Sequence, residues 1–344
     1  MWLHYTDNVA MKIGLIDCDS HNFPNLALMK ISGWHKSRGD VVEWAKPKHE
    51  VVQSDLFYTV EAPTKNEYDR IYASKIFTFS PDFDRNRYHA NEFELGGTGY
   101  DIKKCLPEEI DKFLKPDYSI YPQYPFSIQF FSRGCIRHCP FCLVHDKEGG
   151  IHPVEPMQLN PNGKWIEVLD NNFFASPSWK SAIDYLMAAK QPVNFHGVDV
   201  RIMDEEQAYW LNKLRLKNNI HIAWDLPQID LTEKLKAIVK YIKPYKITCY
   251  VLIGFNSTIE QDLFRLNTLK QLNILPFVQP YRDYSTNRVP TRYEKDLQRW
   301  ANRAWLFRSI DFEEYEPRKG FKCKAYFNET LSVKCYHLVR SYQP

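Results

Sequence analysis

The sequence predicts an α/β protein in two main parts, an N-terminal α/β domain followed by a longer series that forms a parallel sheet or partial barrel. The chain has 344 residues, more than twice the length of a typical domain of ~150 residues. Hydrophobic residues make up 44% of it and charged residues 25%, a globular composition. Short β-rich runs alternate with helical stretches, as expected of strands joined by helical crossovers.

Residues 11–100 are predicted to form the first domain. Residues 25–37 carry apolar side chains at helical spacing and are followed by Arg38 and Gly39, which predicts a helix that ends there. Strands are predicted at 11–16, 41–44, 70–79 and 93–95. Four prolines interrupt residues 101–125, which we expect to be a linker.

Residues 126–284 repeat the alternation on a larger scale. Strands are predicted at 127–131, 165–169, 193–195, 221–224, 247–251 and 276–278, and helices at 178–190, 204–216, 231–242 and 258–272. Six strands with helical crossovers favour a parallel sheet or a barrel. In barrels of this kind the chemistry lies at the carboxyl ends of the strands.

Residues 285–344 form a basic, aromatic C-terminal extension. They hold 12 Lys and Arg against 7 Asp and Glu, a net charge of +5 within a chain of net charge +3. One helix is predicted at 292–308, where arginines alternate with aromatic residues: Arg292, Arg299, Trp300, Arg303, Trp305, Phe307 and Arg308. Such a helix can stack bases and neutralise phosphates. The favoured alternative is a helix that closes the barrel with its aromatic side chains in the core and its arginines in solvent.

Three cysteines follow the first strand of the second series. Cys135, Cys139 and Cys142 stand in the pattern C-x-x-x-C-P-F-C. Three thiolates on one short loop can hold a single iron–sulfur cluster. The spacing alone also allows a zinc site completed by His138 or His145, or three buried thiols.

The stretch from Phe131 to Cys142, with Arg-Gly before the first cysteine and an aromatic residue before the last, resembles the radical S-adenosylmethionine superfamily. That resemblance implies a partial (β/α)6 barrel and a [4Fe–4S] cluster on the three cysteines. The open iron of the cluster binds S-adenosylmethionine, which is reductively cleaved to a 5′-deoxyadenosyl radical that abstracts hydrogen from a substrate. It also implies an electron donor of the flavodoxin or ferredoxin type. The substrate, a small molecule, a peptide or RNA, is not readable.

The resemblance implies a set of S-adenosylmethionine contacts at the strand ends. Phe141 holds the position whose backbone lies near the adenine. Asp170 and Asn171 stand where many members carry Gly-Gly-Glu, a departure that leaves a plain turn as the alternative. The remaining candidates follow later strands and also have ordinary structural explanations: Asp199, Arg201, Asp225 and Gly254.

The first domain resembles cobalamin-binding domains, which are Rossmann-like and carry Asp-x-His-x-x-Gly after the first strand. The matching residues are Asp19, His21, Ser74, Gly96 and Gly97. His21 would be an axial cobalt ligand oriented by Asp19. Pro24 replaces the motif's glycine, so the alternatives are bound cobalamin or the same fold without it, with Asp19 and His21 capping the next helix.

The sequence therefore predicts a radical S-adenosylmethionine enzyme, with cobalamin-dependent methyl transfer as one subclass. The alternative is a non-catalytic protein that binds zinc through the same cysteines and RNA through the basic extension. No apolar run approaches the ~20 residues of a membrane-spanning helix, and residues 1–10 lack the apolar core of a signal peptide. We therefore expect a cytoplasmic protein with no membrane partner.

Overall fold

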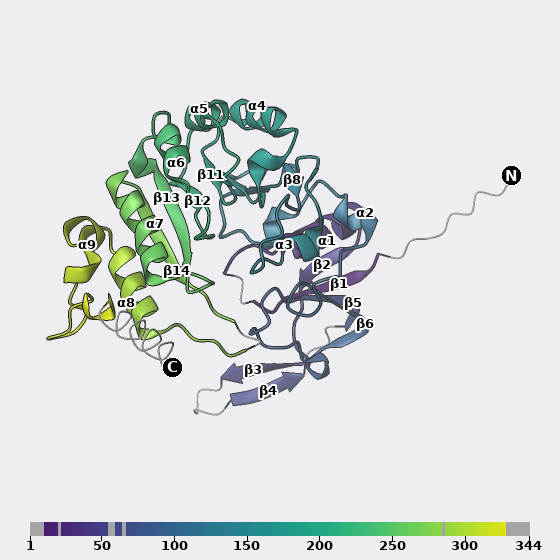
Figure 1. Ribbon diagram of the computed structural model, residues 1–344. Coiled ribbons are helices and arrows are strands. Elements are labelled where there is room, and N and C mark those ends of the chain that lie inside the picture. Colours follow the sequence, from purple (N-terminus) through teal and green to yellow (C-terminus); the bar gives the residue numbers. More distant parts are fainter. Residues whose placement is uncertain (1–9, 20–21, 54–58, 64–66, 284–285, 328–344) are drawn as a thin grey trace, which may run out of the picture. The chain divides into compact units, whose positions relative to one another are not determined.

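The structure is a computed structural model that describes residues 10–19, 22–53, 59–63, 67–283 and 286–327. The chain divides into two compact units, Met1–Ile166 and Glu167–Pro344, which are treated separately below. Both contain parallel strands and helices, so the predicted α/β class is confirmed (Figure 1). The boundaries predicted at 101–125 and 285 remain predictions.

The first unit is built on a four-stranded parallel sheet of order β2-β1-β5-β6. Its strands are β1 (Lys12–Asp17), β2 (Val41–Trp44), β5 (Glu67–Ser74) and β6 (His89–Gly96). Helix α1 (Leu26–Ser37) begins where the Asn25 side chain accepts a hydrogen bond from the Leu28 backbone N–H. Apolar side chains of α1 and the sheet, joined by one from residues 108–111, form the core of this unit: Ile13, Leu15, Leu28, Ile31, Tyr72 and Ile110.

A histidine is buried under this sheet. His35 is 1% exposed; its Nδ1 lies 2.6 Å from Asp40 Oδ2 and its Nε2 lies 3.1 Å from the Tyr72 hydroxyl. Burial lowers the pKa of His35, and the bond to Asp40 opposes that shift only in part. The folded protein therefore holds this ring neutral at a pH at which the unfolded chain, with a histidine pKa of about 6.5, binds a proton.

This difference predicts a stability that falls in acid. Below about pH 6.5 the unfolded state binds more protons than the folded state, so the free energy of unfolding decreases as the pH falls toward the lowered pKa of His35. One such group contributes at most about 1.4 kcal/mol per pH unit. Urea unfolding between pH 7 and 5 should show a shallower pH dependence for His35→Gln than for the wild type. Identical slopes would contradict this role for His35.

The rest of the first unit consists of short elements. An antiparallel hairpin that was not predicted is formed by β3 (His49–Gln53) and β4 (Thr59–Pro63). The proline-rich stretch contains α2 (Glu108–Asp111) and a 3-10 turn at Tyr118–Ile120. Four further elements follow: β7 (Ser127–Gln129), β8 (Ser132–Arg133), α3 (Val144–Glu148) and β9 (His152–Pro153). β10 (Ile166–Val168) begins at the last residue of this unit.

The second unit alternates strands and helices as predicted. Its strands after β10 are β11 (Val193–Phe195), β12 (Ile220–Ala223), β13 (Ile247–Ile253) and β14 (Leu275–Pro280). β12, β13 and β14 form a parallel sheet, and β11 is a neighbour of β10. The helices α4 (Trp179–Ala189), α5 (Glu205–Lys213), α6 (Thr232–Ile238) and α7 (Ile259–Gln271) follow one another around one side of these strands (Figure 1). The specific partial-barrel architecture remains a prediction.

Two predicted elements were wrong in extent. The strand predicted at 70–79 ends at Ser74, because the Asp19 carboxylate binds the following loop. The helix predicted at 292–308 is two helices, α8 (Arg292–Ala301) and α9 (Ala304–Ser309). Between them the Asn302 side chain accepts from the Val278 N–H at 2.6 Å and donates to the Val278 carbonyl at 3.0 Å, and Arg303 is extended. The bonds to β14 replace the helical continuation.

The C-terminal helices place most of their aromatic side chains inside. Trp300 is 0% exposed and Phe307 1%, whereas Trp305 is 67% exposed. The four arginines of this stretch are exposed: Arg292, Arg299, Arg303 and Arg308. This is the pattern of a helix pair that packs on a core, with a basic outer surface. Across the described ranges, no helix has both the length and the apolar character needed to cross a bilayer.

Candidate metal centre and strand-end site

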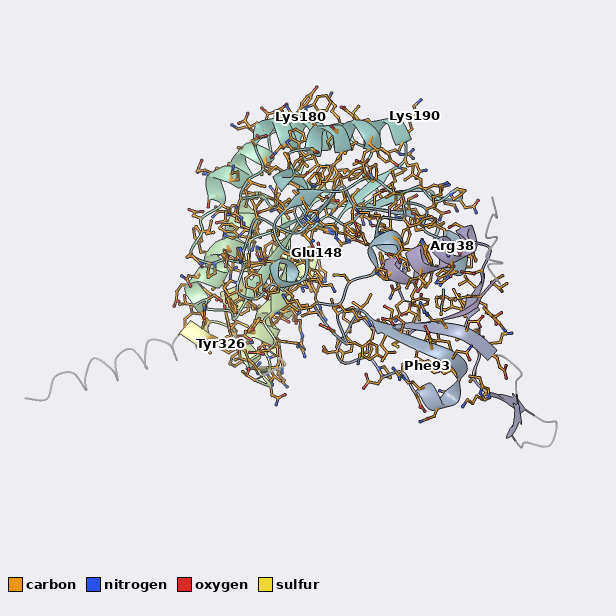
Figure 2. All side chains as sticks on the ribbon, turned by 90° about the vertical axis from the view of Figure 1, so that its right-hand side faces the viewer. Arg38, Phe93, Glu148, Lys180, Lys190 and Tyr326 are labelled. Carbon is orange, nitrogen blue, oxygen red and sulfur yellow. The ribbon has the colours of Figure 1, made fainter. Side chains whose placement is uncertain are left out.

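The three cysteines lie on one loop of the first unit, and strands β8 and β9 bracket it. Ser132 pairs with Pro153 and Arg133 with His152, so the ends of the loop are brought side by side. The Glu148 carboxylate fastens the same point: it accepts from Arg133 Nε at 3.1 Å, from Arg133 Nη2 at 2.6 Å and from the Gly134 N–H at 2.8 Å. Figure 2 labels Glu148, on helix α3. A bidentate Arg–carboxylate pair of this kind has a defined geometry.

Gly134 makes this closure possible. Its φ is +77°, and a Cβ there would lie 2.3 Å from the Gly150 carbonyl oxygen. The Cys135 N–H donates to the Gly149 carbonyl at 3.2 Å, which continues the closure by one residue. Only glycine adopts this conformation and tolerates this approach without strain. The Arg-Gly before Cys135 therefore has a structural reason in this fold.

The three thiols themselves are accessible. Cys135 and Cys139 are half-buried, Cys142 is exposed, and none of them forms a disulfide. The Cys142 N–H donates to the Cys139 carbonyl at 2.9 Å, which makes residues 139–142 a tight turn, and the Arg137 N–H donates to Cys135 Sγ at 3.4 Å. Backbone N–H bonds to sulfur are among the contacts that tune iron–sulfur clusters.

The three thiols are donors that both a zinc ion and an iron–sulfur cluster accept. Within the described ranges, no three His, Cys, Asp or Glu side chains are placed so that they could hold one metal ion. A tetrahedral zinc site needs its ligands around a single point, whereas each thiolate of a cubane cluster binds a different iron. His138 and His145, the proposed zinc ligands, have ring centroids 3.4 Å apart and contact each other.

The second unit gathers several predicted residues at the ends of its strands. Asp199 Oδ1 accepts from the Arg201 N–H at 3.0 Å and from Arg201 Nε at 2.7 Å, and its Oδ2 accepts from Arg201 Nη2 at 3.0 Å. Asn172 Nδ2 donates to Asp199 Oδ2 at 3.3 Å. Asp170 is 1% exposed. Its carbonyl oxygen lies close to Gly197, where an added Cβ would be 2.0 Å from that oxygen.

Asp225 belongs to the same strand-end cluster. It follows β12, its Oδ1 accepts from the Leu252 N–H of β13 at 3.1 Å, and burial raises its pKa. The charges of Asp199 and Arg201 also act on this carboxyl, Asp199 raising its pKa and Arg201 lowering it. The structure therefore brings together Asn172, Asp199, Arg201 and Asp225 as one polar group at the carboxyl ends of β10, β11 and β12, and it places the Asp170 carbonyl beside Gly197.

Gly254, predicted to lie beside an adenine, has a different neighbour. Its φ is +73°, and a Cβ there would lie 2.2 Å from Glu294 Oε1. Arg288 Nη2 donates to the Gly254 carbonyl at 2.9 Å and to Glu294 Oε1 at 2.6 Å. The glycine is thus required for the approach of the Arg288–Glu294 ion pair. This ion pair was not identified from the sequence. Arg288 and Glu294 lie 34 and 40 positions after Gly254, so no local pattern connects them to the end of β13.

Two further residues were missed. Arg265 is 0% exposed and donates to the Trp224 carbonyl at 2.7 Å and to Asp262 Oδ1 at 2.6 Å. It therefore ties helix α7 to the residue that follows β12. Glu148 closes the cysteine loop, as described above. The spacing Arg133 to Glu148 gives no local signal, since the two residues meet only through the β8–β9 pairing. The Asp262–Arg265 spacing of three on a helix is a signal that could have been read.

The candidate cobalamin residues have partners within the protein. The Asp19 carboxylate accepts from the Ile76 N–H at 2.6 Å, the Phe77 N–H at 3.2 Å and the Ser80 hydroxyl at 2.6 Å. The Ser74 hydroxyl accepts from Asn25 Nδ2 at 2.8 Å. Asp19 therefore holds a loop of its own unit. His21 lies outside the described residues.

The two glycines after β6 complete this comparison. Gly97 has φ +96°, and a Cβ there would lie 2.3 Å from the Lys75 carbonyl oxygen, whereas a Cβ at Gly96 would meet nothing within 4 Å. The Lys75 side chain, in a residue only 5% exposed, has its Nζ 4.5 Å from the centre of the Tyr100 ring. Asp19, Ser74 and Gly97 thus have contacts inside the unit, whereas Gly96 faces open space. Cobalamin binding by this set remains a prediction.

The other cysteines were expected to be ordinary thiols. Cys249 and Cys323 are buried, and burial raises the pKa of both. Cys18 lies 3.7 Å from the Tyr100 hydroxyl, and burial raises its pKa as well. Cys105 is exposed, and Cys335 lies outside the described residues.

Comparison with known proteins adds no assignment to this geometry. No model of a known protein family matches the chain, and no curated protein matches it in sequence.

Proposed function

We propose that the chain is a radical S-adenosylmethionine enzyme whose cluster is held by Cys135, Cys139 and Cys142. The observation that carries this proposal is the cysteine loop. Three accessible thiols stand within eight residues on a loop whose two ends are tied by paired strands and by the Glu148 carboxylate. A tied loop limits the positions of all three sulfurs before any cluster binds, which reduces the entropy lost on binding.

The strand-end residues of the second unit have the chemistry to bind the amino-acid part of S-adenosylmethionine. Asp170 and Asp199 are carboxylates suited to an ammonium group, and the Arg201 guanidinium is suited to a carboxylate. Asp199 holds Arg201 in place through its backbone and side-chain bonds. Phe141 lies on the cysteine loop, where its backbone is our candidate for an adenine contact.

When bound, the cluster supplies the electron that cleaves S-adenosylmethionine to methionine and the 5′-deoxyadenosyl radical. The role of this chain is to bind and orient both cofactors and to exclude water from the radical. The electron comes from a donor of the flavodoxin or ferredoxin type. We derive no step through cobalamin, whose binding by the first unit remains a prediction.

The proposal is tested on the full chain after anaerobic purification and reconstitution of the cluster. We expect about four iron and four sulfide per chain, and 5′-deoxyadenosine after addition of S-adenosylmethionine and dithionite. Cys139→Ala should lose at least 100-fold in 5′-deoxyadenosine formation, whereas Cys105→Ala, which removes an exposed thiol outside the loop, should retain wild-type formation. Chromatography with mass detection measures the product.

Zinc and cobalamin are separate outcomes of the same preparation. One zinc per chain with no iron after reconstitution would overturn the enzyme and favour the zinc- and RNA-binding alternative. Retention of hydroxocobalamin through gel filtration, with loss on His21→Ala, would support cobalamin binding by the first unit. Wild-type protein that never retains it would support the same fold without the cofactor.

A further inference from the structure

The second unit has a group of polar and aromatic side chains that includes the less buried face of β12 and β13. Alternate residues of β13 are fully buried: Ile247, Cys249, Val251 and Ile253. The residues between them face the other way and are only half-buried. Register places Ala223 beside Tyr250 and Tyr250 beside Phe277, so neighbouring strands present their side chains to this same face.

A hydrogen-bonded trio from β10 and the end of β11 belongs to this group. Glu167 Oε2 accepts from Asn194 Nδ2 at 2.7 Å and lies 2.6 Å from His196 Nε2. His196 Nε2 also lies 3.1 Å from Asn194 Nδ2, and the tautomer of the ring sets whether Nε2 donates to Glu167 or accepts from Asn194. The same carboxylate fixes the amide of Asn194, because the flipped amide would turn its oxygen toward a negative charge.

This arrangement leaves a buried acceptor without a donor. Asn194 is 5% exposed, and its Oδ1 has no hydrogen-bond partner within the described residues. A buried amide oxygen that is left unsatisfied destabilises the fold, because it has given up its hydrogen bonds to water. Buried polar atoms are otherwise almost always paired, so this oxygen points to a missing donor.

The neighbouring strand supplies a second such atom. His221, on β12, has its ring centroid 6.4 Å from that of His196, and its Nδ1 also has no hydrogen-bond partner within the part of the chain described here. Burial lowers the pKa of His221, and electrostatic repulsion from the nearby His196 lowers it further, so the His221 ring is neutral. The ring also bonds to the Phe195 backbone. We place its single proton on Nε2 for that bond, which leaves Nδ1 as an acceptor.

Aromatic rings continue the group along the sheet. The His221 ring centroid lies 5.2 Å from that of Tyr250, and the Tyr250 centroid lies 5.4 Å from that of Phe277. Phe277, on the edge strand β14, is 42% exposed and leaves its ring open to solvent. Flat ligands stack on rings of this type.

We propose that this side-chain cluster, defined as Glu167, Asn194, His196, His221, Tyr250 and Phe277, binds a flat group that offers two N–H donors on one edge. Asn194 Oδ1 and His221 Nδ1 accept from those donors, and the aromatic rings cover the flat face. Glu167 and His196 hold Asn194 in the required orientation. The proposal goes beyond the enzyme assignment and uses none of the cysteines.

Two common chemical groups have this edge. Guanine offers its ring N–H and its exocyclic amino group side by side, and a guanidinium offers two parallel N–H bonds. Inosine is the matched control for guanosine, since it keeps the ring N–H and lacks the amino group. Methylguanidine and N-methylacetamide, which is flat but offers a single N–H, make the equivalent pair of small probes for a guanidinium source.

The experiment is titration of the full chain with these four compounds, without S-adenosylmethionine or reductant, by isothermal calorimetry or ligand-observed NMR. We expect guanosine to bind at least ten-fold more tightly than inosine if a base is the ligand, or methylguanidine to bind and N-methylacetamide not to bind if a guanidinium is. Either result supports the shared two-donor chemistry. Binding of none of the four, or equal binding of guanosine and inosine with no binding of methylguanidine, would overturn it and leave water as the partner of the two acceptors.

Substitutions assign the binding to these residues. His221→Phe keeps a ring of similar size but removes the acceptor, and should weaken binding of the preferred probe at least ten-fold. Asn194→Leu should do the same, with thermal unfolding used to show that the variant is folded. Tyr245→Phe, at an exposed ring elsewhere in the unit, should bind as the wild type. Unchanged binding by folded His221→Phe would refute the site. Because no cluster chemistry is measured, failure here is distinct from failure of the enzyme proposal.

Discussion

Replacement of Arg265 by leucine is expected to lower the free energy of unfolding by about 3–5 kcal/mol, the usual cost of removing one partner of a buried ion pair. Arg265 is fully buried, with Nη2 2.6 Å from Asp262 Oδ1 and Nη1 2.7 Å from the Trp224 carbonyl oxygen. Burial already raises the pKa of Asp262 to about 6. Without Arg265 this carboxyl loses its cation, and the Trp224 carbonyl loses its donor.

Urea or thermal unfolding measures this effect, and two controls isolate its cause. The double variant Arg265→Leu with Asp262→Leu should recover part of the loss, because an apolar pair of suitable volume avoids the buried charge. Arg299→Leu removes an exposed arginine of α8 and should change stability by less than about 0.5 kcal/mol. A decrease in the free energy of unfolding of less than about 1 kcal/mol for Arg265→Leu, well below the usual cost of breaking a buried pair, would show that the Asp262–Arg265 pair does not stabilise the end of β12.

Replacement of Glu148 by glutamine is expected to weaken the hold of the protein on its iron. Glu148 accepts three hydrogen bonds at the closure of the cysteine loop, two from Arg133 and one from the Gly134 N–H. Glutamine removes the negative charge and presents only one acceptor oxygen. A charge-assisted bond contributes about 1.5–3 kcal/mol, so the closed loop should become about ten- to a hundred-fold less favoured.

The measurement is the rate at which reconstituted protein releases iron to a chelator, together with the iron retained after gel filtration. Asp146→Asn is the matched control, since Asp146 is an exposed carboxylate on the same helix. Faster release from Glu148→Gln, with Asp146→Asn at the wild-type rate, is the expected result. Equal rates in all three proteins would show that the Glu148 clamp does not set the geometry of the loop.

Local patterns in the sequence predicted most elements well. The helix expected at 25–37 is α1 at Leu26–Ser37, and the strand expected at 193–195 is β11 with identical bounds. Helix 258–272 is α7, where Thr258 and Gln261 form a capping box. These succeed because periodicity and capping depend on residues only a few positions apart. The β3–β4 hairpin and the break at Asn302 were missed; the break depends on β14, which is distant in sequence.

The candidate sites show the same difference between local patterns and contacts made by residues distant in sequence. The sequence by itself determined the class of fold, the order of strands and helices, and the grouping of Cys135, Cys139 and Cys142 on one loop, because each of these follows from neighbours along the chain. Only the tertiary structure decided that Glu148 closes that loop, that Gly254 makes room for Arg288 and Glu294, and that Asn194 Oδ1 and His221 Nδ1 are buried acceptors for which the described residues supply no donor. The physical reason is that these contacts join residues on different elements, where strand pairing and packing, and not spacing, set which side chains meet.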